Sequence, residues 1–168
     1  ESGLGWQFKP SIRIQGSHQL KDVVQTFTGI ESGADNIYII ERDEPIIEKF
    51  KSSFGEIVFP VIKGTNVYRY VFEDSPYYVI VPYSKDKQLL KAEFIEKKHP
   101  EIWNYLEQNR EQLEGREKGK MKHPNWYGYV YPKNLYKYSN KRLIWTDISI
   151  KPQFVIDETQ SWHVRTVC

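Results

Sequence analysis

The chain has 168 residues and a formal net charge of +2, with 24 Lys and Arg against 22 Asp and Glu. This length suits one domain with a substantial hydrophobic core. The single cysteine, Cys168, excludes an internal disulfide, and no apolar run approaches the roughly 20 residues of a membrane-spanning helix, so we expect a cytoplasmic protein without a membrane partner.

Residues 28–36 predict a loop, because Gly29, Gly33 and Asn36 tolerate positive φ angles. The sequence Ile-Tyr-Ile-Ile at 37–40 predicts a buried strand after this loop. A dinucleotide-binding fingerprint needs a strand before its glycines and a helix after them. The order here is the opposite, so the loop does not predict a nucleotide site.

Residues 56–83 are rich in β-branched and aromatic side chains and predict strands. Lys-Gly-Thr-Asn at 63–66 predicts a turn within this region. Pro82 is expected to end the last of these strands, because proline cannot donate a hydrogen bond to a sheet.

A helical insertion is predicted at about residues 88–116. Its first part carries Leu90 and Phe94 at helical spacing, and Pro100 suits the first position of a second helix. Gly115 is a natural end for that helix. The second helix carries an apolar stripe that we expect to lie in the core: Ile102, Trp103, Leu106 and Leu113.

Aromatic rings and cations are concentrated between residues 125 and 157. The alternation in Trp-Tyr-Gly-Tyr-Val-Tyr at 126–131 predicts a strand, and further strands are predicted at 142–150 and 154–157. Residues 133–141 predict a turn. Together the elements predict one α+β domain over residues 1–168, with a twisted, mainly antiparallel sheet and a central helical insertion.

The sequence contains no catalytic or metal-ligand motif that we would assign. It has no CxxC, no HExxH and no GxSxG, and its four histidines are widely scattered. Glu96-Lys97-Lys98 resembles half of a nuclease motif but is predicted on a helix. Because of this partial resemblance, a small metal-dependent nuclease using Glu96 and Lys98 stays as one alternative.

The segments follow one another in an informative order, with a helix ending Leu113-x-x-Arg116 before a Trp126-Tyr127 pair. This ordered set, from about Leu20 to Asp157, resembles the TaqI-like C-terminal specificity domain. That domain is the target recognition part of adenine-specific DNA methyltransferases in bacterial restriction-modification systems. The family usually shows TGxxTG where this chain has Thr-Gly-Ile-Glu-Ser-Gly at 28–33.

The resemblance implies a module that binds duplex DNA sequence-specifically and directs N6-adenine methylation, or cleavage, by other domains. A covalently linked upstream methyltransferase domain would bind S-adenosylmethionine, and this fragment alone would have neither cofactor nor catalytic residues. The chain begins with Glu1 and its only methionine is Met121, so we expect a piece excised from a larger protein.

Cations on polar turns suit phosphates, and amide side chains suit base edges. The candidate DNA-binding residues are Ser32, Asn36, Lys133, Asn134, Lys137, Asn140, Lys141, Arg142, Lys151 and Gln153. The chain also has twelve tyrosines, whose amphipathic rings suit other binding surfaces. A protein- or carbohydrate-binding module is therefore a second alternative.

Overall fold

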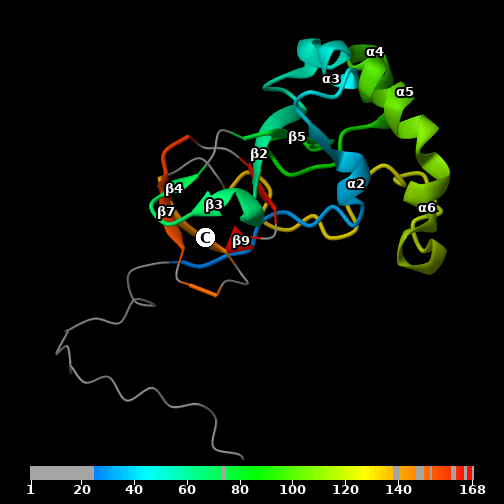
Figure 1. Ribbon diagram of the computed structural model, residues 1–168. Coiled ribbons are helices and arrows are strands. Elements are labelled where there is room, and N and C mark those ends of the chain that lie inside the picture. Colours follow the sequence, from blue (N-terminus) through cyan, green and yellow to red (C-terminus); the bar gives the residue numbers. More distant parts are fainter. Residues whose placement is uncertain are drawn as a thin grey trace, which may run out of the picture.

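The computed structural model describes residues 25–72, 75–137, 141–146, 150–151, 153–159, 162–164 and 166–167 (Figure 1). The described residues form one mixed α+β domain, which confirms the predicted fold class. Helices α3 to α6 lie on one side of Figure 1, and strands β3, β4, β7 and β9 lie together on the other. Among the residues with a described position, no helix is long and apolar enough to cross a membrane.

A four-stranded sheet forms the centre of the domain in the order β1-β5-β2-β8. Its strands are β1 (Ile39–Glu41), β2 (Val58–Lys63), β5 (Tyr77–Ile80) and β8 (Trp162–Val164). The β1-β5 and β5-β2 pairs are antiparallel, whereas β2 and β8 are parallel. As predicted, β5 ends before Pro82.

The helical elements precede and follow the first strands of this sheet. Short elements are α2 (Asp35–Tyr38), α3 (Ile46–Lys49), η1 (Lys51–Ser53) and η2 (Gly64–Asn66). The longer helices are α4 (Ala92–Lys98), α5 (Pro100–Gln108) and α6 (Arg110–Gly119). Regular helical dihedral angles stop at Arg116 (φ −58°, ψ 151°), directly after the predicted end at Gly115.

The apolar stripe of α5 and α6 lies in the main core, as predicted. The side chains of Ile102, Leu106 and Leu113 are fully buried, and Trp103 is partly buried against them. On α4 the buried residue is Ile95, whereas Phe94 is 43% exposed. The predicted Leu90–Phe94 pairing is wrong because α4 begins only at Ala92, after Leu90.

Two smaller sheets form what we call the small lobe. One contains β3 (Val67–Tyr68) and β4 (Val71–Phe72), and the other has the order β7-β6-β9. The latter strands are β6 (Arg142–Thr146), β7 (Phe154–Asp157) and β9 (Thr166–Val167). Four side chains form a second core here: Ile62, Val67, Ile144 and Val155.

Strand β2 contributes to both cores. Val61 is buried in the main core, whereas its neighbour Ile62 is buried in the second core, of the small lobe. This division follows from the alternation of side chains along a strand, which places consecutive residues on opposite faces.

Two predicted strands differ from the structure. The segment at 37–40 is divided, because α2 continues to Tyr38 and β1 begins only at Ile39. All of residues 126–131 are described, and they form turns with one bridge, between Tyr131 and Glu31. The carbonyls of Trp126 and Gly128 in this segment accept hydrogen bonds from a buried arginine rather than from a neighbouring strand.

Candidate nucleic-acid interface

Residues 131–137 form an exposed turn held from below by two anchors, and we call this segment the basic turn. Leu135 is 1% exposed in the main core. The hydroxyl of Tyr136 donates to the carbonyl oxygen of Tyr83 at 2.6 Å. Its ring meets the Trp162 ring edge-on, with the centroids 5.0 Å apart. These contacts fix the backbone of the turn before any ligand arrives.

The residues on either side of these anchors point cations outward over aromatic rings. Lys133 and Lys137 are exposed, and their Nζ atoms lie 5.5 Å and 5.2 Å from the ring centroids of Tyr131 and Phe27. Asn134 donates from its side-chain amide to the carbonyl oxygen of Thr28 at 3.0 Å. Three of the sequence-predicted residues are thus brought together on one turn.

The backbone of the basic turn is locally unusual. Asn134 and Tyr136 both have φ angles of 56°, in the left-handed region. Asparagine tolerates this conformation, whereas a bulky aromatic residue rarely adopts it. Tyr136 is kept there by its hydrogen bond to Tyr83 and by its packing against Trp162.

The electrostatics of the basic turn favour an anionic ligand. The turn contains two lysines and no acid, and the backbone of one acid, Glu31, pairs with Tyr131. Burial raises the pKa of Tyr136 to about 12, and burial also raises the pKa of Tyr83 to about 12. Both phenols are therefore neutral near pH 7 and add no negative charge beneath the lysines.

The second group of predicted residues lies on the hairpin of β6 and β7, where the residues differ in exposure. Lys141 forms an ion pair with Glu158 in solvent, and Lys151 is exposed. The side-chain oxygen of Gln153 lies 3.5 Å from the Thr146 hydroxyl, which donates to it. Asn140 lies outside the described residues, so its placement stays a prediction.

Arg142 is not the exposed arm that the sequence suggested. Its side chain is 8% exposed and pairs with the fully buried carboxylate of Asp157, which lies opposite it in the register. The same guanidinium also contacts Nε2 of His163, a residue that is itself fully buried. The physical reason is the alternation of β6, which turns Arg142 and Ile144 towards the second core.

Arg142, Asp157 and His163 form a buried cluster, and their surroundings determine which of them are charged. Burial opposes the charge on Asp157, but hydrogen bonds from His163 and Thr159 and the charge of Arg142 outweigh it and lower its pKa to about 2. Burial lowers the pKa of His163, as does the nearby Arg142, although the hydrogen bond with Asp157 opposes the change. The cluster therefore holds a charged Arg142–Asp157 pair beside a neutral imidazole, which is an internal support rather than a ligand surface.

The two predicted residues in the glycine loop also differ in exposure. Asn36 is exposed on α2, whereas Ser32 is only 1% exposed. The Ser32 hydroxyl donates to Oδ1 of Asp35 at 2.7 Å and accepts from the backbone N–H of Ala34 at 3.1 Å. Ser32 thus orders the start of α2, and its expected position on the surface is wrong.

Sequence reasoning missed the role of Arg116, which links three segments of the domain. Its guanidinium donates to the carbonyl oxygens of Leu113 at 2.8 Å, Ser32 at 2.9 Å and Gly128 at 2.9 Å. A further hydrogen bond goes to the carbonyl oxygen of Trp126. The sequence feature that could have indicated this role is the position of Arg116 directly after an apolar helical stripe, where the regular helix ends.

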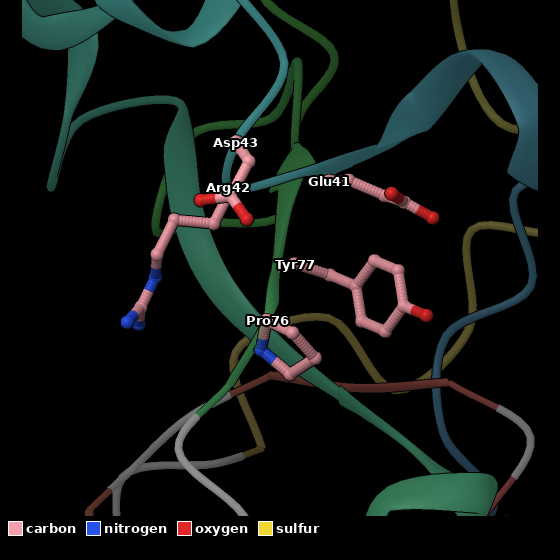
Figure 2. Close-up of a pocket in the computed structure, with 5 residues that line it drawn as sticks. All are labelled: Glu41, Arg42, Asp43, Pro76 and Tyr77. Atoms are coloured by element: carbon pink, nitrogen blue, oxygen red, sulfur yellow. The ribbon is translucent and has the colours of Figure 1, made fainter.

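A shallow depression on the described surface is shown in Figure 2 and is lined by Glu41, Arg42, Asp43, Pro76 and Tyr77. Glu41 and Tyr77 are register partners and point to the same side, away from Arg42. Two acids and one arginine make this depression a poor site for a polyanion. Within the described ranges, no three His, Cys, Asp or Glu side chains gather as metal ligands.

The nuclease alternative receives no geometric support. Glu96 and Lys98 are exposed on α4 and lie two positions apart, which separates their directions by about 200° around the helix. The ammonium of Lys98 pairs instead with Glu56. The two side chains therefore do not converge on one reacting group.

Comparison with known proteins adds one relative. The chain resembles part of a Type II methyltransferase. It is 27% identical over 128 residues to the Type II methyltransferase M.MjaIV of Methanocaldococcus jannaschii, across 75% of this chain. The chain spans only 41% of the length of that relative. No family model matches the chain.

Proposed function

We propose that this chain is a DNA target recognition domain associated with a Type II methyltransferase of a restriction-modification system. The observation that carries the proposal is the basic turn, in which Leu135 and Tyr136 anchor the backbone and Lys133 and Lys137 are exposed. Asn134 is half-buried beside them, with its amide on the Thr28 carbonyl. The similarity to M.MjaIV supports the association with this class of enzyme.

The chemistry of the turn suits two kinds of DNA contact. Lys133 and Lys137 can neutralise phosphates, which supplies affinity that does not depend on base sequence. Amide side chains such as those of Asn134 and the exposed Asn36 can pair with adenine edges. The Asn134 amide is held in place by Thr28, so it would meet DNA with little loss of side-chain freedom.

Ser32 and Arg142 are left out of the proposed interface because both side chains are buried. Lys141, Lys151 and Gln153 remain candidates on the β6–β7 hairpin. Of these, Lys141 would have to leave Glu158 to reach a phosphate, which makes its contribution smaller than that of the basic turn.

The first experiment measures duplex binding by the chain at several salt concentrations. Lys133→Ala and Lys137→Ala should each weaken binding to all duplexes alike and reduce the salt slope by about one. Lys97→Ala is the matched control, because Lys97 is an exposed lysine on α4, among the helices. Equal salt slopes for the wild type and the double variant Lys133→Ala/Lys137→Ala would refute the proposed interface.

The outer face of β6 and β7 carries exposed apolar side chains that suit contact with a protein partner. Leu143 and Ile156 are register partners that are 45% and 55% exposed, and Phe154 is 42% exposed beside Trp145. Exposed apolar side chains of this kind suit contact with another protein surface. We assign this face to the catalytic region of a Type II methyltransferase, because the chain spans only 41% of the length of M.MjaIV.

That assignment is tested by adding the catalytic region as a separate chain. Leu143→Lys and Ile156→Lys should weaken the association in sedimentation velocity, whereas Lys97→Ala should leave it unchanged. S-adenosylmethionine would be bound by that catalytic region. FxGxG and NPP[YFW] are the two signatures of an S-adenosylmethionine-dependent adenine methyltransferase, and this sequence carries neither. Association that is insensitive to both apolar variants would remove this face from the proposal.

A further inference from the structure

The hairpin between β3 and β4 presents an exposed aromatic ring at its tip. Tyr68 pairs with Val71 in the register, so Arg69 and Tyr70 form a two-residue loop. Tyr70 is 75% exposed, more than any other aromatic side chain in the described part of the chain. A ring this accessible adds little to the packing of the fold.

The backbone of Tyr70 is also in a conformation that the residue disfavours. Its φ angle is 69°, where glycine or asparagine would fit with less strain than a bulky side chain. The backbone N–H of Tyr70 donates to the carbonyl oxygen of Phe154 at 2.9 Å, which ties the loop to β7. The turn itself therefore does not explain why a tyrosine occupies this position.

The neighbouring charge indicates what kind of partner this ring suits. Arg69 donates from Nη2 to the Tyr70 hydroxyl at 3.1 Å, and its guanidinium carbon lies 4.9 Å from the ring centroid. From Val58 to Phe72 the chain carries Lys63 and Arg69 and no acid, although Glu73 and Asp74 follow outside the described residues. A ring with a cation at its side matches a nucleic acid, where bases lie next to phosphates.

We propose that the Arg69–Tyr70 tip is a second DNA-contacting element, distinct from the basic turn. The Tyr70 ring stacks against a base and opens one base step of the duplex, while Arg69 contacts a flanking phosphate. This inference rests on the proposed DNA-binding function and adds a deformation of the duplex to it.

The test uses the full chain and duplexes that carry 2-aminopurine at successive positions, because the fluorescence of this base rises when it unstacks. Wild-type protein should raise the fluorescence at one position. Tyr70→Asn, which suits the φ angle of the loop, should abolish this rise and weaken binding by about 5- to 150-fold. Tyr70→Phe should keep the rise, and Arg69→Ala should keep it while reducing the salt slope by about one.

The thermal midpoint separates this outcome from misfolding. Tyr70→Asn should have an unchanged or higher midpoint, since asparagine relieves the strained φ angle. A fluorescence rise as large with Tyr70→Asn as with wild type would overturn the inference and leave the DNA-binding function standing. Binding by wild type without a rise at any position would overturn it as well. If wild type binds no duplex, the proposed function itself fails.

Discussion

Arg142 and Asp157 lie opposite each other on β6 and β7 and pair on the buried side of the sheet, whereas Lys141 pairs with Glu158 in solvent. Removing Arg142 would leave a buried carboxylate without its cation. Arg142→Ala should therefore lower the free energy of unfolding by about 3–5 kcal/mol, measured by urea denaturation. Lys141→Ala should change it little, because exposed ion pairs contribute little. Equal and small losses for both variants would contradict the buried pair.

Acidification should destabilise the domain in two steps. Burial lowers the pKa values of His99 and His163 below 6.5, so the unfolded chain takes up protons first and stability falls as the pH drops below about 6.5. The lowered pKa of Asp157, about 2 against 3.8, contributes stability that is present above pH 3.8 and is lost as the pH falls through about 2.

Urea denaturation at a series of pH values would measure the first of these steps. His99→Gln should make the fall in stability below pH 6.5 shallower, because one buried imidazole no longer titrates on unfolding. His123→Gln is the control, since His123 is exposed. An unchanged slope in His99→Gln would show that His99 does not contribute to the pH dependence.

Arg116→Met should lower the free energy of unfolding by on the order of 3 kcal/mol, because several backbone carbonyls lose their donor at once. Arg110→Met is a matched control, since Arg110 is exposed and pairs with Glu107 at the end of α5 and with Glu114 on its own helix, α6. Thermal unfolding of the two variants side by side gives the comparison. A smaller loss for Arg116→Met than for Arg110→Met would refute its linking role.

Alanine substitutions at Gly29 and at Gly115 should change the stability of the domain in opposite directions. A Cβ at Gly29 would lie 2.4 Å from the carbonyl oxygen of His163, so Gly29→Ala should force the loop away from β8 and lower the thermal midpoint. A Cβ at Gly115 would meet nothing within 4 Å, and alanine there should stabilise α6 by about 0.5–1 kcal/mol. Calorimetry of both variants checks the sign of each change.

Leu106→Ala should cost about 2–5 kcal/mol of unfolding free energy, because loss of the fully buried leucine side chain leaves a cavity in the main core. Phe94→Ala on α4 should cost much less, since that ring is 43% exposed. A midpoint that is unaffected by Leu106→Ala would mean that α5 does not pack as described.

Sequence periodicity predicts those elements in which the pattern of buried side chains follows from the regular geometry of one helix or one strand. The stripe of Ile102, Leu106 and Leu113 and the strand at Phe154–Asp157 belong to this class. The segment at Trp126 was misread, because its hydrogen-bond partner Arg116 belongs to a preceding helix and local patterns do not report such contacts.

The candidate site was predictable only in part for a similar reason. A turn rich in lysine and tyrosine was visible in the sequence, and the structure shows Lys133 and Lys137 exposed on it. The burial of Arg142 was not visible, because it depends on the register that sets Asp157 opposite it. Register is a property of the paired strands rather than of either strand alone.

The membership of β2 in two cores has a consequence for how the domain opens. Val61 and Ile62 are consecutive, so the backbone between them cannot be released from one core while the other stays intact. The small lobe should therefore not behave as an independent foldon, and the amide protons of β2 should exchange with solvent only when the whole domain unfolds. Native-state hydrogen exchange would then report the global free energy of unfolding at these amides, whereas the tip of the β3–β4 hairpin would exchange through local opening.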